Sequence, residues 1–200
     1  MLTFEEEFYK DNLLLIAGCD EAGRGPVAGP LVVASCILPA NFNNELINDS
    51  KKITAKNREK AYELIIKNAI DFSIIIISVE EIDKDNNIYQ TTKKAMIKAF
   101  LMLNVIPDLY LTDAMPLDDI NNKKVISIIK GDSKAKNIAA ASILAKVTRD
   151  RIMDELDKKY PEYKFIKNKG YLTKDHINAL KNYGYIKNIH RKSYAPIKNM

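Results

Sequence analysis

The sequence predicts an α/β fold in which helices flank a mixed, five-stranded β-sheet. Two observations lead to this prediction. Five short apolar segments have the length and residue types of strands, and longer segments between and after them place apolar residues at helical spacing. The order along the chain is strand, strand, helix, strand, helix, strand, strand, helix, followed by a basic segment with helical character. Such an order is typical of a sheet with helices on its faces.

The first two strands are expected to pair antiparallel. Residues 13–19 form a short apolar run bounded by turn residues, as expected of a strand that is covered on both faces. A second strand is predicted over residues 27–38, and Pro39 ends it. The connection between the two is short, which favours an antiparallel turn.

The middle of the chain is expected to supply the other three strands and two helical regions. In chain order, a helix is expected over 54–70 and a strand over 71–77. A helical region follows, which opens with a capping box at 78–81, breaks near 85–87 and ends at 103. Two further strands are expected over 109–112 and 125–129.

The C-terminal third is expected to be helical. The longest helix is predicted to begin near Ser133 and to continue to residue 159, and Pro161 stops it. A shorter helix is predicted over residues 174–183, with Thr173 as its N-cap and Gly184 as its C-terminal signal.

Composition places the chain among ordinary folded proteins. Its 200 residues are 46% hydrophobic and 28% charged, which suits a main domain, expected over 1–160, with a basic helical extension over 161–200 packed on it. No apolar run approaches the roughly 20 residues that span a bilayer, and the acidic start is unlike a secretory signal, so a cytoplasmic location without membrane contact is expected. Cys19 and Cys36 lie in apolar segments and are expected to be free, buried thiols.

Positive charge is concentrated near the C-terminus. The formal net charge of the chain is +5, but residues 158–200 alone carry eleven Lys or Arg against two acidic residues, or +9, which leaves −4 for the rest. Six of the ten tyrosines lie in the same segment. Cations that meet phosphates, interleaved with rings that stack on sugars or bases, suit a nucleic-acid partner. The alternative is a solvated, lysine-rich surface.

Two adjacent carboxylates, Asp20 and Glu21, end the first apolar run, and a glycine-flanked arginine, Arg24, follows them. Neighbouring residues on a strand point to opposite faces, so both carboxylates serve one site only if the chain leaves the sheet there. Ala22-Gly23 permits that departure. Arg24 then either neutralises these carboxylates or reaches a neighbouring anion.

Two further carboxylates, Asp113 and Asp132, come where the fourth and fifth strands stop. Adjacent strands would bring all four acidic side chains together, and such a group needs divalent cations to offset its repulsion. Oxygen ligands favour Mg²⁺ or Mn²⁺, and two such ions about 4 Å apart suit phosphodiester hydrolysis. The sequence therefore predicts a nuclease. The alternatives are a turn residue before Pro116 for Asp113 and a helix cap for Asp132.

Six motifs in this order resemble the successive signatures of bacterial ribonuclease HII, a type 2 ribonuclease H. They are residues 20–30 (DEAGRGPVAGP), 49–52 (DSKK), 131–133 (GDS), 139–150 (AAASILAKVTRD), 169–171 (KGY) and 190–193 (HRKS). The resemblance covers nearly the whole chain. It implies a ribonuclease H-like fold with a five-stranded mixed sheet and a C-terminal helical extension.

The resemblance also implies an activity: endonucleolytic cleavage of RNA in RNA–DNA hybrids, and incision 5′ of single ribonucleotides embedded in duplex DNA, leaving 3′-hydroxyl and 5′-phosphate ends. Matched by motif, the family's catalytic, metal-binding carboxylates are Asp20, Glu21, Asp113 and Asp132. The implied cofactor is Mn²⁺ or Mg²⁺, with two ions expected when substrate is bound.

Substrate contacts follow from the same resemblance. Gly23, Arg24 and Gly25 fall on the loop that recognises the 2′-hydroxyl at an RNA-to-DNA junction, and Tyr171 falls on the tyrosine that packs against the sugar of the following deoxynucleotide. The residues that look like phosphate contacts are Ser50, Lys51, Ser142 and Lys146, the last two being four apart on one helix face. The alternatives are core filling for Tyr171 and a solvated face for the hydroxyls and cations.

The departures from the family pattern are mild. Ala114 and Met115 follow Asp113 where Gly and Asn are often seen, and Tyr194 stands where Phe is common. The only histidines, His176 and His190, have no spaced partner for a metal site and are assigned to structure or backbone contacts.

Two other interpretations compete. Ribonuclease HIII has the same fold without the junction preference, but it carries an N-terminal substrate-binding extension, and here about a dozen residues precede the first strand. A nucleic-acid-binding module without catalysis would use the basic C-terminal segment alone. A monomer is expected because the sequence shows no interface feature that requires a protein partner.

Overall fold

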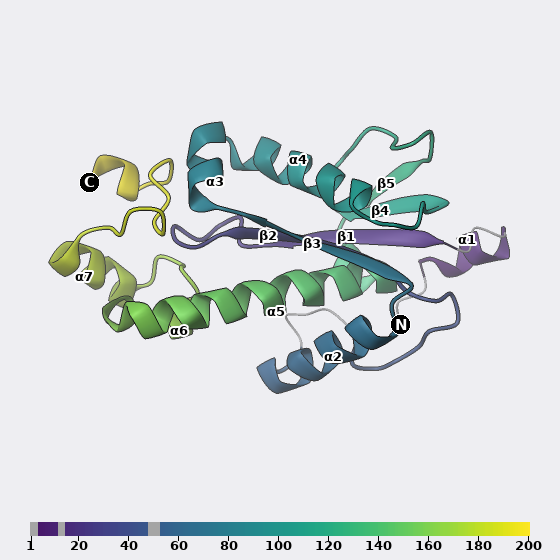
Figure 1. Cartoon of the computed structure of the whole chain (residues 1–200), viewed down its shortest axis with the longest axis horizontal. Coiled ribbons are helices and arrows are strands. Elements are labelled where there is room, and N and C mark those ends of the chain that lie inside the picture. The colour runs from purple at the N-terminus through teal and green to yellow at the C-terminus, as the bar shows by residue number, and fades with distance from the viewer. Residues whose placement is uncertain (1–3, 12–14, 48–52) are drawn as a thin grey trace.

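The computed structural model of the chain describes residues 4–11, 15–47 and 53–200. Its five strands form one mixed sheet in the order β3-β2-β1-β4-β5 (Figure 1). The strands are β1 (Ile16–Ala22), β2 (Leu31–Ile37), β3 (Asp71–Ile77), β4 (Leu109–Asp113) and β5 (Val125–Ile128). β1 pairs antiparallel with β2 and parallel with β4, β3 pairs antiparallel with β2, and β5 pairs parallel with β4. The predicted five-stranded mixed sheet and its antiparallel first pair are confirmed.

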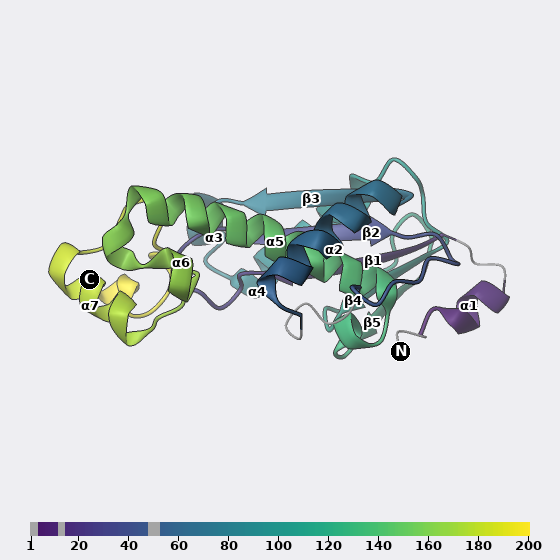
Figure 2. The ribbon, with the colours of Figure 1, turned by 90° about the horizontal axis from the view of Figure 1, so that it is seen from below.

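Helices lie on both faces of this sheet. α3 and α4 cover one face, and α2 and the long α5 cover the other (Figures 1 and 2). The helices are α1 (Glu6–Lys10), α2 (Ala55–Asn68), α3 (Val79–Asp85), α4 (Ile88–Leu101), α5 (Lys136–Lys159), α6 (Phe165–Asn168) and α7 (Lys174–Tyr183), with short 3₁₀ turns at Gly131–Ser133, Pro161–Tyr163 and Ile197–Asn199. None of the helices in the described ranges is long and apolar enough to cross a membrane.

The centre of the core is β2, whose seven residues are all buried. Val33 belongs to the apolar cluster that contains Met96 and Phe100 of α4, whereas its neighbour Ala34 belongs to the cluster that contains Ile143 of α5. Alternate residues of one strand therefore serve the two faces, as strand geometry requires. Both cysteines are free and buried, as predicted.

Gly18 lets α5 lie directly on the sheet. A Cβ atom added to Gly18 in β1 would lie 2.2 Å from the backbone of Asn137 and Ile138, a distance that no side chain tolerates. The glycine therefore allows α5 to approach β1 closely. The face of α5 that carries Ser142 is thereby brought over the carboxyl end of β1.

The long helix does not begin where the sequence predicted. Gly131–Ser133 form a 3₁₀ turn, and α5 begins at Lys136 after an extended Ala135 that makes no side-chain cap. Its N-terminus is instead capped from the other end of the chain. The Glu5 carboxylate accepts from the backbone N–H of Lys136 at 3.1 Å and of Asn137 at 2.9 Å, taking the place of an N-cap side chain.

The predicted bounds of the first two strands are also corrected. β1 continues to Ala22, three residues beyond the expected end, and β2 begins at Leu31 instead of residue 27. Residues 27–29 instead bond to the C-terminal segment. The N–H groups of Val27 and Ala28 donate to the Gly170 carbonyl oxygen at 3.0 and 3.3 Å, and that of Gly29 donates to the Ile189 carbonyl oxygen at 2.8 Å.

The remaining predicted elements are confirmed within a few residues at their ends. Ser78 and Glu81 form the predicted capping box of α3, and Asn86, with a φ of 48°, makes the predicted break before α4. α7 has Thr173 as its N-cap and Gly184 at its C-terminal end.

The segment after α5 shares an apolar core with the rest of the chain. Val27, Ala28 and Met153 pack there with Tyr163 and Phe165, and the cluster also includes residues of α7 and of the last turn. Figure 1 places α6, α7 and the C-terminus together at one end of the molecule. Residues of the C-terminal segment therefore share one apolar cluster with Val27, Ala28 and Met153.

Candidate active site

Three aspartates meet at the carboxyl ends of the parallel strands. Asp20 lies in β1, Asp113 is the last residue of β4, and Asp132 lies in the turn after β5. One carboxylate oxygen from each lies within 4.8 Å of the others. Asp20 and Asp132 are each only 4% exposed. The strand order β1-β4-β5 thus converts the ends of three separate sequence segments into one group.

Backbone N–H groups orient two of these carboxylates. The N–H of Gly131 donates to Asp113 Oδ1 at 2.7 Å and so ties β4 to the turn that carries Asp132. The N–H of Glu21 donates to Asp20 Oδ1, also at 2.7 Å. These side chains are therefore held in place before any ligand arrives.

The group carries unfavourable negative charge. Burial raises the pKa of Asp20 well above its usual range, the charges of Glu21 and Asp113 raise it further, and hydrogen bonds from the Ser142 side chain and the Glu21 N–H oppose them. A divalent cation bound among these oxygens would remove this penalty. Because every donor is a carboxylate, the set fits a hard ion of the Mg²⁺ or Mn²⁺ kind.

Glu21 reaches the same cavity by a route that the sequence did not predict. β1 stays paired with β2 as far as Ala22, whereas its pairing with β4 ends at Cys19. One edge of β1 is therefore open from Asp20 onward, and the chain does not need to leave the sheet. Glu21 is outside the group of three aspartates, and its Oε1 forms an ion pair with Arg24 Nη1 at 3.3 Å.

The carboxylates open into a cavity of about 380 Å³. It is lined by the acidic residues Asp20, Glu21 and Asp113, by residues 22–25, by Tyr171, and by Ser142, Lys146 and Arg149 of α5. The structure thus brings ten of the twelve sequence-predicted site residues to one place, with Asp132 beside Asp20 and Asp113. The other two, Ser50 and Lys51, lie outside the described residues.

Arg149 supports residues 23–30, the connection between β1 and β2, and sequence reasoning missed this role. It is 1% exposed, and its guanidinium donates to the carbonyl oxygens of Pro30 at 3.0 Å, Ala28 at 3.0 Å and Lys169 at 2.9 Å. Burial and the nearby Arg191 lower its pKa to about 10, which leaves it a cation at neutral pH. Gly23 has a φ of 99°, and a Cβ there would lie 2.2 Å from Arg149 Nε.

Arg191, from the C-terminal segment, holds the other side of the same loop. Its guanidinium donates to the carbonyl oxygens of Gly23 at 2.7 Å, Arg24 at 3.1 Å and Gly29 at 2.8 Å. The Tyr194 hydroxyl donates to the Arg24 carbonyl oxygen at 2.7 Å. Both arginines belong to motifs visible in the sequence, but nothing in those motifs indicates that their partners are carbonyl groups.

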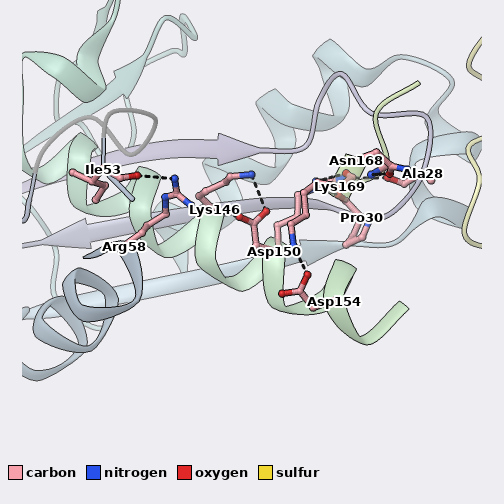
Figure 3. Close-up of polar contacts among 11 residues, drawn as sticks. Ala28, Pro30, Ile53, Arg58, Lys146, Asp150, Asp154, Asn168 and Lys169 are labelled. Atoms are coloured by element: carbon pink, nitrogen blue, oxygen red, sulfur yellow. Dashed lines mark hydrogen bonds and ion pairs between the residues drawn. The ribbon is translucent and has the colours of Figure 1, made fainter. Parts of the chain in front are cut away.

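The two predicted phosphate contacts on α5 have different surroundings. Ser142 is 5% exposed and bonds to Asp20, whereas Lys146 Nζ donates to Asp150 Oδ1 at 2.7 Å. Figure 3 shows this pair, with Arg58 alongside and donating to the Ile53 carbonyl oxygen. Lys146 thus lines the cavity with its charge already paired on the helix surface.

Tyr171 is placed at the surface and not in the core. Its side chain is 50% exposed, and a Cβ on Gly25 would lie 3.4 Å from its ring, so the ring lies beside the Gly23–Gly25 loop. The alternative of core filling is therefore wrong. His176 and His190 are fully buried away from the carboxylates, in agreement with their predicted structural role.

A five-stranded mixed sheet with acidic residues at the ends of β1, β4 and β5 defines the ribonuclease H class of metal-dependent nucleases. The family model described as Ribonuclease HII matches residues 17–197. The chain belongs to the ribonuclease HII family. Members of this family are endonucleases that hydrolyse phosphodiester bonds by a two-metal mechanism, act on RNA–DNA hybrids and depend on divalent metal ions.

Individual relatives agree with this assignment. The chain is 52% identical over 195 residues to ribonuclease HII of Acetivibrio thermocellus, covering 98% of this chain and 75% of that protein. It is 49% identical to ribonuclease HII of Mycoplasma mycoides subsp. mycoides, covering 94% and 90%. The crystal structure of ribonuclease H2 from Pyrococcus horikoshii superposes with a TM-score of 0.81 at 28% identity, covering 93% of this chain and 96% of that one.

Proposed function

We propose that this protein incises the strand 5′ of single ribonucleotides embedded in duplex DNA, in addition to cleaving the RNA strand of hybrids, and leaves 3′-hydroxyl and 5′-phosphate ends. One observation carries the proposal. The carboxylate group, the Gly23–Gly25 loop and the exposed Tyr171 ring line one cavity. A scissile phosphate at the carboxylates would therefore place its sugars beside the loop and the ring.

The catalytic roles belong to the four acidic residues. Asp20, Asp113 and Asp132 would hold divalent ions, Mn²⁺ or Mg²⁺, with Glu21 completing the set when two ions are present with substrate. Such ions, when bound, activate water and stabilise the leaving oxygen of a phosphodiester. The carboxylates themselves fix where the ions sit, and the hydrogen bonds from Gly131 and Glu21 keep Asp113 and Asp20 turned toward them.

The loop and the ring would read the sugars. Buried Arg191 bonds to the carbonyl oxygens of Gly23 and Arg24, and buried Arg149 bonds to those of Ala28 and Pro30, so the loop is fixed in place beside a ligand such as the ribose 2′-hydroxyl. The flat face of Tyr171 leaves room for a deoxyribose and crowds an extra hydroxyl. Ser142, Lys146, Ser50 and Lys51 are proposed to contact phosphates on either side.

The test is incision of a DNA duplex that carries one ribonucleotide, with and without Mn²⁺ or Mg²⁺. Asp132→Asn should lower kcat by about a hundredfold or more. It should also raise the melting temperature of the metal-free protein, because one of three crowded carboxylates becomes neutral. Asp118→Asn is the matched control, since its side chain is 99% exposed, and it should change neither quantity.

Three outcomes separate the alternatives. Absence of metal-dependent incision by the wild-type protein would overturn the proposal and favour a binding module without catalysis. Cleavage confined to longer RNA tracts would favour activity of the ribonuclease HIII kind. Loss of junction incision in Tyr171→Ala, with hybrid cleavage retained, would support the assigned role of the ring.

We also propose that the protein acts as a monomer in the cytoplasm. Its carboxylates, loop, ring and buried arginines all come from a single chain. Sedimentation of the purified protein at micromolar concentration tests the first point, and a dimer would contradict it.

A further inference from the structure

The two histidines form a buried pair beside the candidate site. His176 lies in α7 and His190 lies after it, both are fully buried, and their Nε2 atoms are 3.0 Å apart. Rings surround them: Phe165 meets His176 edge to face with centroids 5.4 Å apart, and Tyr163 lies 5.2 Å from His190. Neither histidine contributes to the three-aspartate group or to the lining of the cavity.

The hydrogen bonds at both ends of the pair fix where the protons are. The Ile186 N–H donates to His190 Nδ1 at 2.9 Å, so in neutral His190 the proton is on Nε2. His176 Nδ1 lies 2.9 Å from the carbonyl oxygen of Tyr171, which can only accept, so the proton of His176 is on Nδ1. His190 Nε2 therefore donates to His176 Nε2, and every ring nitrogen has a partner.

This chain of hydrogen bonds ends on the backbone of Tyr171. The Tyr171 carbonyl oxygen accepts from His176 Nδ1 and from the Thr173 N–H, and its own N–H donates to the Asn168 carbonyl oxygen at 2.8 Å. The Tyr171 side chain, in contrast, is half exposed and lines the cavity. The Tyr171 backbone is therefore fixed by hydrogen bonds, whereas its ring is exposed to the cavity.

The other end of the chain of hydrogen bonds is joined to the Gly23–Gly25 loop. His190 forms a bridge with Ala28, and the N–H of its neighbour Arg191 donates to the Val27 carbonyl oxygen at 2.8 Å. The Arg191 side chain holds the carbonyl oxygens of Gly23 and Arg24. One dipeptide, His190-Arg191, thus contacts both the support of Tyr171 and the loop beside its ring.

We propose that His176 and His190 are positioning residues that set the Tyr171 ring against the Gly23–Gly25 loop and thereby determine discrimination of the RNA–DNA junction. This inference rests on the proposed function, in which Tyr171 packs on the sugar that follows the ribonucleotide. It predicts a selective defect. Loss of the donor at His176 Nδ1 should impair junction incision more than cleavage within a continuous RNA tract, where that ring contact is not decisive.

Two substitutions of His176 separate this role from general support. In His176→Asn the side-chain amide stands near Nδ1 and can still donate to the Tyr171 carbonyl oxygen, whereas in His176→Gln it stands near Nε2 and that donor is lost. With His176→Gln, kcat/KM on the single-ribonucleotide duplex should fall about tenfold. On an all-RNA strand paired with DNA it should stay within about twofold. His176→Asn should stay close to wild type on both.

Combination with Tyr171→Ala distinguishes failure of this inference from failure of the proposed function. If Tyr171→Ala leaves the ratio of the two activities unchanged, the assigned role of Tyr171 is wrong. If Tyr171→Ala lowers the ratio but His176→Gln does not, the positioning role is wrong. In the double variant, His176→Gln should add no further change to the ratio, since both act through one contact; additive losses would overturn the inference.

The proton arrangement offers a test that needs no variant. Long-range ¹H–¹⁵N spectra of the wild-type protein at neutral pH report which ring nitrogen of each histidine is protonated. We expect the Nδ1–H form for His176 and the Nε2–H form for His190. The opposite form at His176 would remove its donor to Tyr171 and refute the inference even if the substituted proteins fail to fold.

Discussion

The Tyr194 hydroxyl joins the C-terminal segment to the loop that lines the candidate active site. It donates to the Arg24 carbonyl oxygen and accepts from Arg191 Nη1 at 3.2 Å. Tyr194→Phe keeps the ring and removes these bonds, so the free energy of unfolding should fall by about 1 kcal/mol. Urea denaturation measures this change, and KM for a single-ribonucleotide duplex should rise in the same variant because the loop loses one anchor.

The matched control for Tyr194→Phe is Tyr183→Phe. Tyr183 is 63% exposed, and within the described part of the chain no hydrogen bond to its hydroxyl is found. Its loss should change the free energy of unfolding by less than about 0.5 kcal/mol. Equal effects of the two substitutions would mean that the hydrogen bonds of the Tyr194 hydroxyl do not contribute to the free energy of unfolding.

Ala114 shows what a departure from the family pattern costs. It follows Asp113 where glycine is often seen, and its φ is 50°, in the left-handed region. A residue with a Cβ pays about 1–2 kcal/mol there. The Ala114 N–H donates to the Ile128 carbonyl oxygen at 3.0 Å, and the Asp113 side chain accepts from the Gly131 N–H. These two hydrogen bonds hold the strained residue and the neighbouring Asp113 in place.

The helix α5 presents Ser142, Lys146 and Arg149 to the same cavity. If Lys146 exchanges its bond with Asp150 for a substrate phosphate, one counterion is released on binding. When binding is measured in the catalytically inactive Asp132→Asn protein, Lys146→Ala should then reduce the slope of log Kd against log salt by about one. Lys158→Ala is the control on the same helix, since its side chain is 71% exposed and paired with Glu155. Equal slopes for both would exclude the phosphate contact.

Elements were predictable where their signals are local. Apolar runs located all five strands, and the carboxyl ends of β1, β4 and β5 brought Asp20, Asp113 and Asp132 together as expected. The start of α5 was not predictable, because its cap is the Glu5 carboxylate, distant in sequence. The short extent of β2 was missed for the same reason: Val27 and Gly29 bond to residues that come much later in the chain.

The candidate site was predictable in its residues but not in its supports. Acidic and glycine-flanked positions were identified from motifs, and the structure places them in one cavity. The carbonyl contacts of Arg149 and Arg191 were not foreseen, because the motifs that contain these residues do not indicate what their side chains bond to. The expectation that the chain leaves the sheet after Glu21 was wrong, since the opening arises where β4 stops pairing with β1.

The C-terminal segment is both a basic surface and a part of the core. Its charge suggested nucleic-acid contact, yet Arg191 is fully buried and bonds to the Gly23–Pro30 loop. Figure 2 shows this segment packed against one end of α5. The C-terminal segment thus holds the Gly23–Gly25 loop through Arg191 and Tyr194, and conditions that loosen the segment should loosen the loop.

A fall in pH should destabilise the folded protein through the histidine pair. Burial, together with the neighbouring His176, lowers the pKa of His190 to about 4, and burial lowers that of His176 as well. Above pH 6.5 the folded and unfolded chains bind the same number of protons at His190. As the pH falls from about 6.5 toward 4, only the unfolded chain takes up a proton, so the folded state loses up to about 3 kcal/mol from His190.

Protonation of other buried groups stabilises the folded state, so the measurement has to isolate the contribution of the histidine pair. The pKa values of Asp20 and Glu5 are raised by burial, and their protonation favours the folded state as the pH falls. We therefore compare urea denaturation of the wild-type protein and His190→Gln at pH 7.5 and pH 5. The wild-type protein should lose more stability between these two values than the variant, by about 2 kcal/mol. Equal losses would mean that His190 is protonated in the folded protein and that the pair is not held neutral by its surroundings.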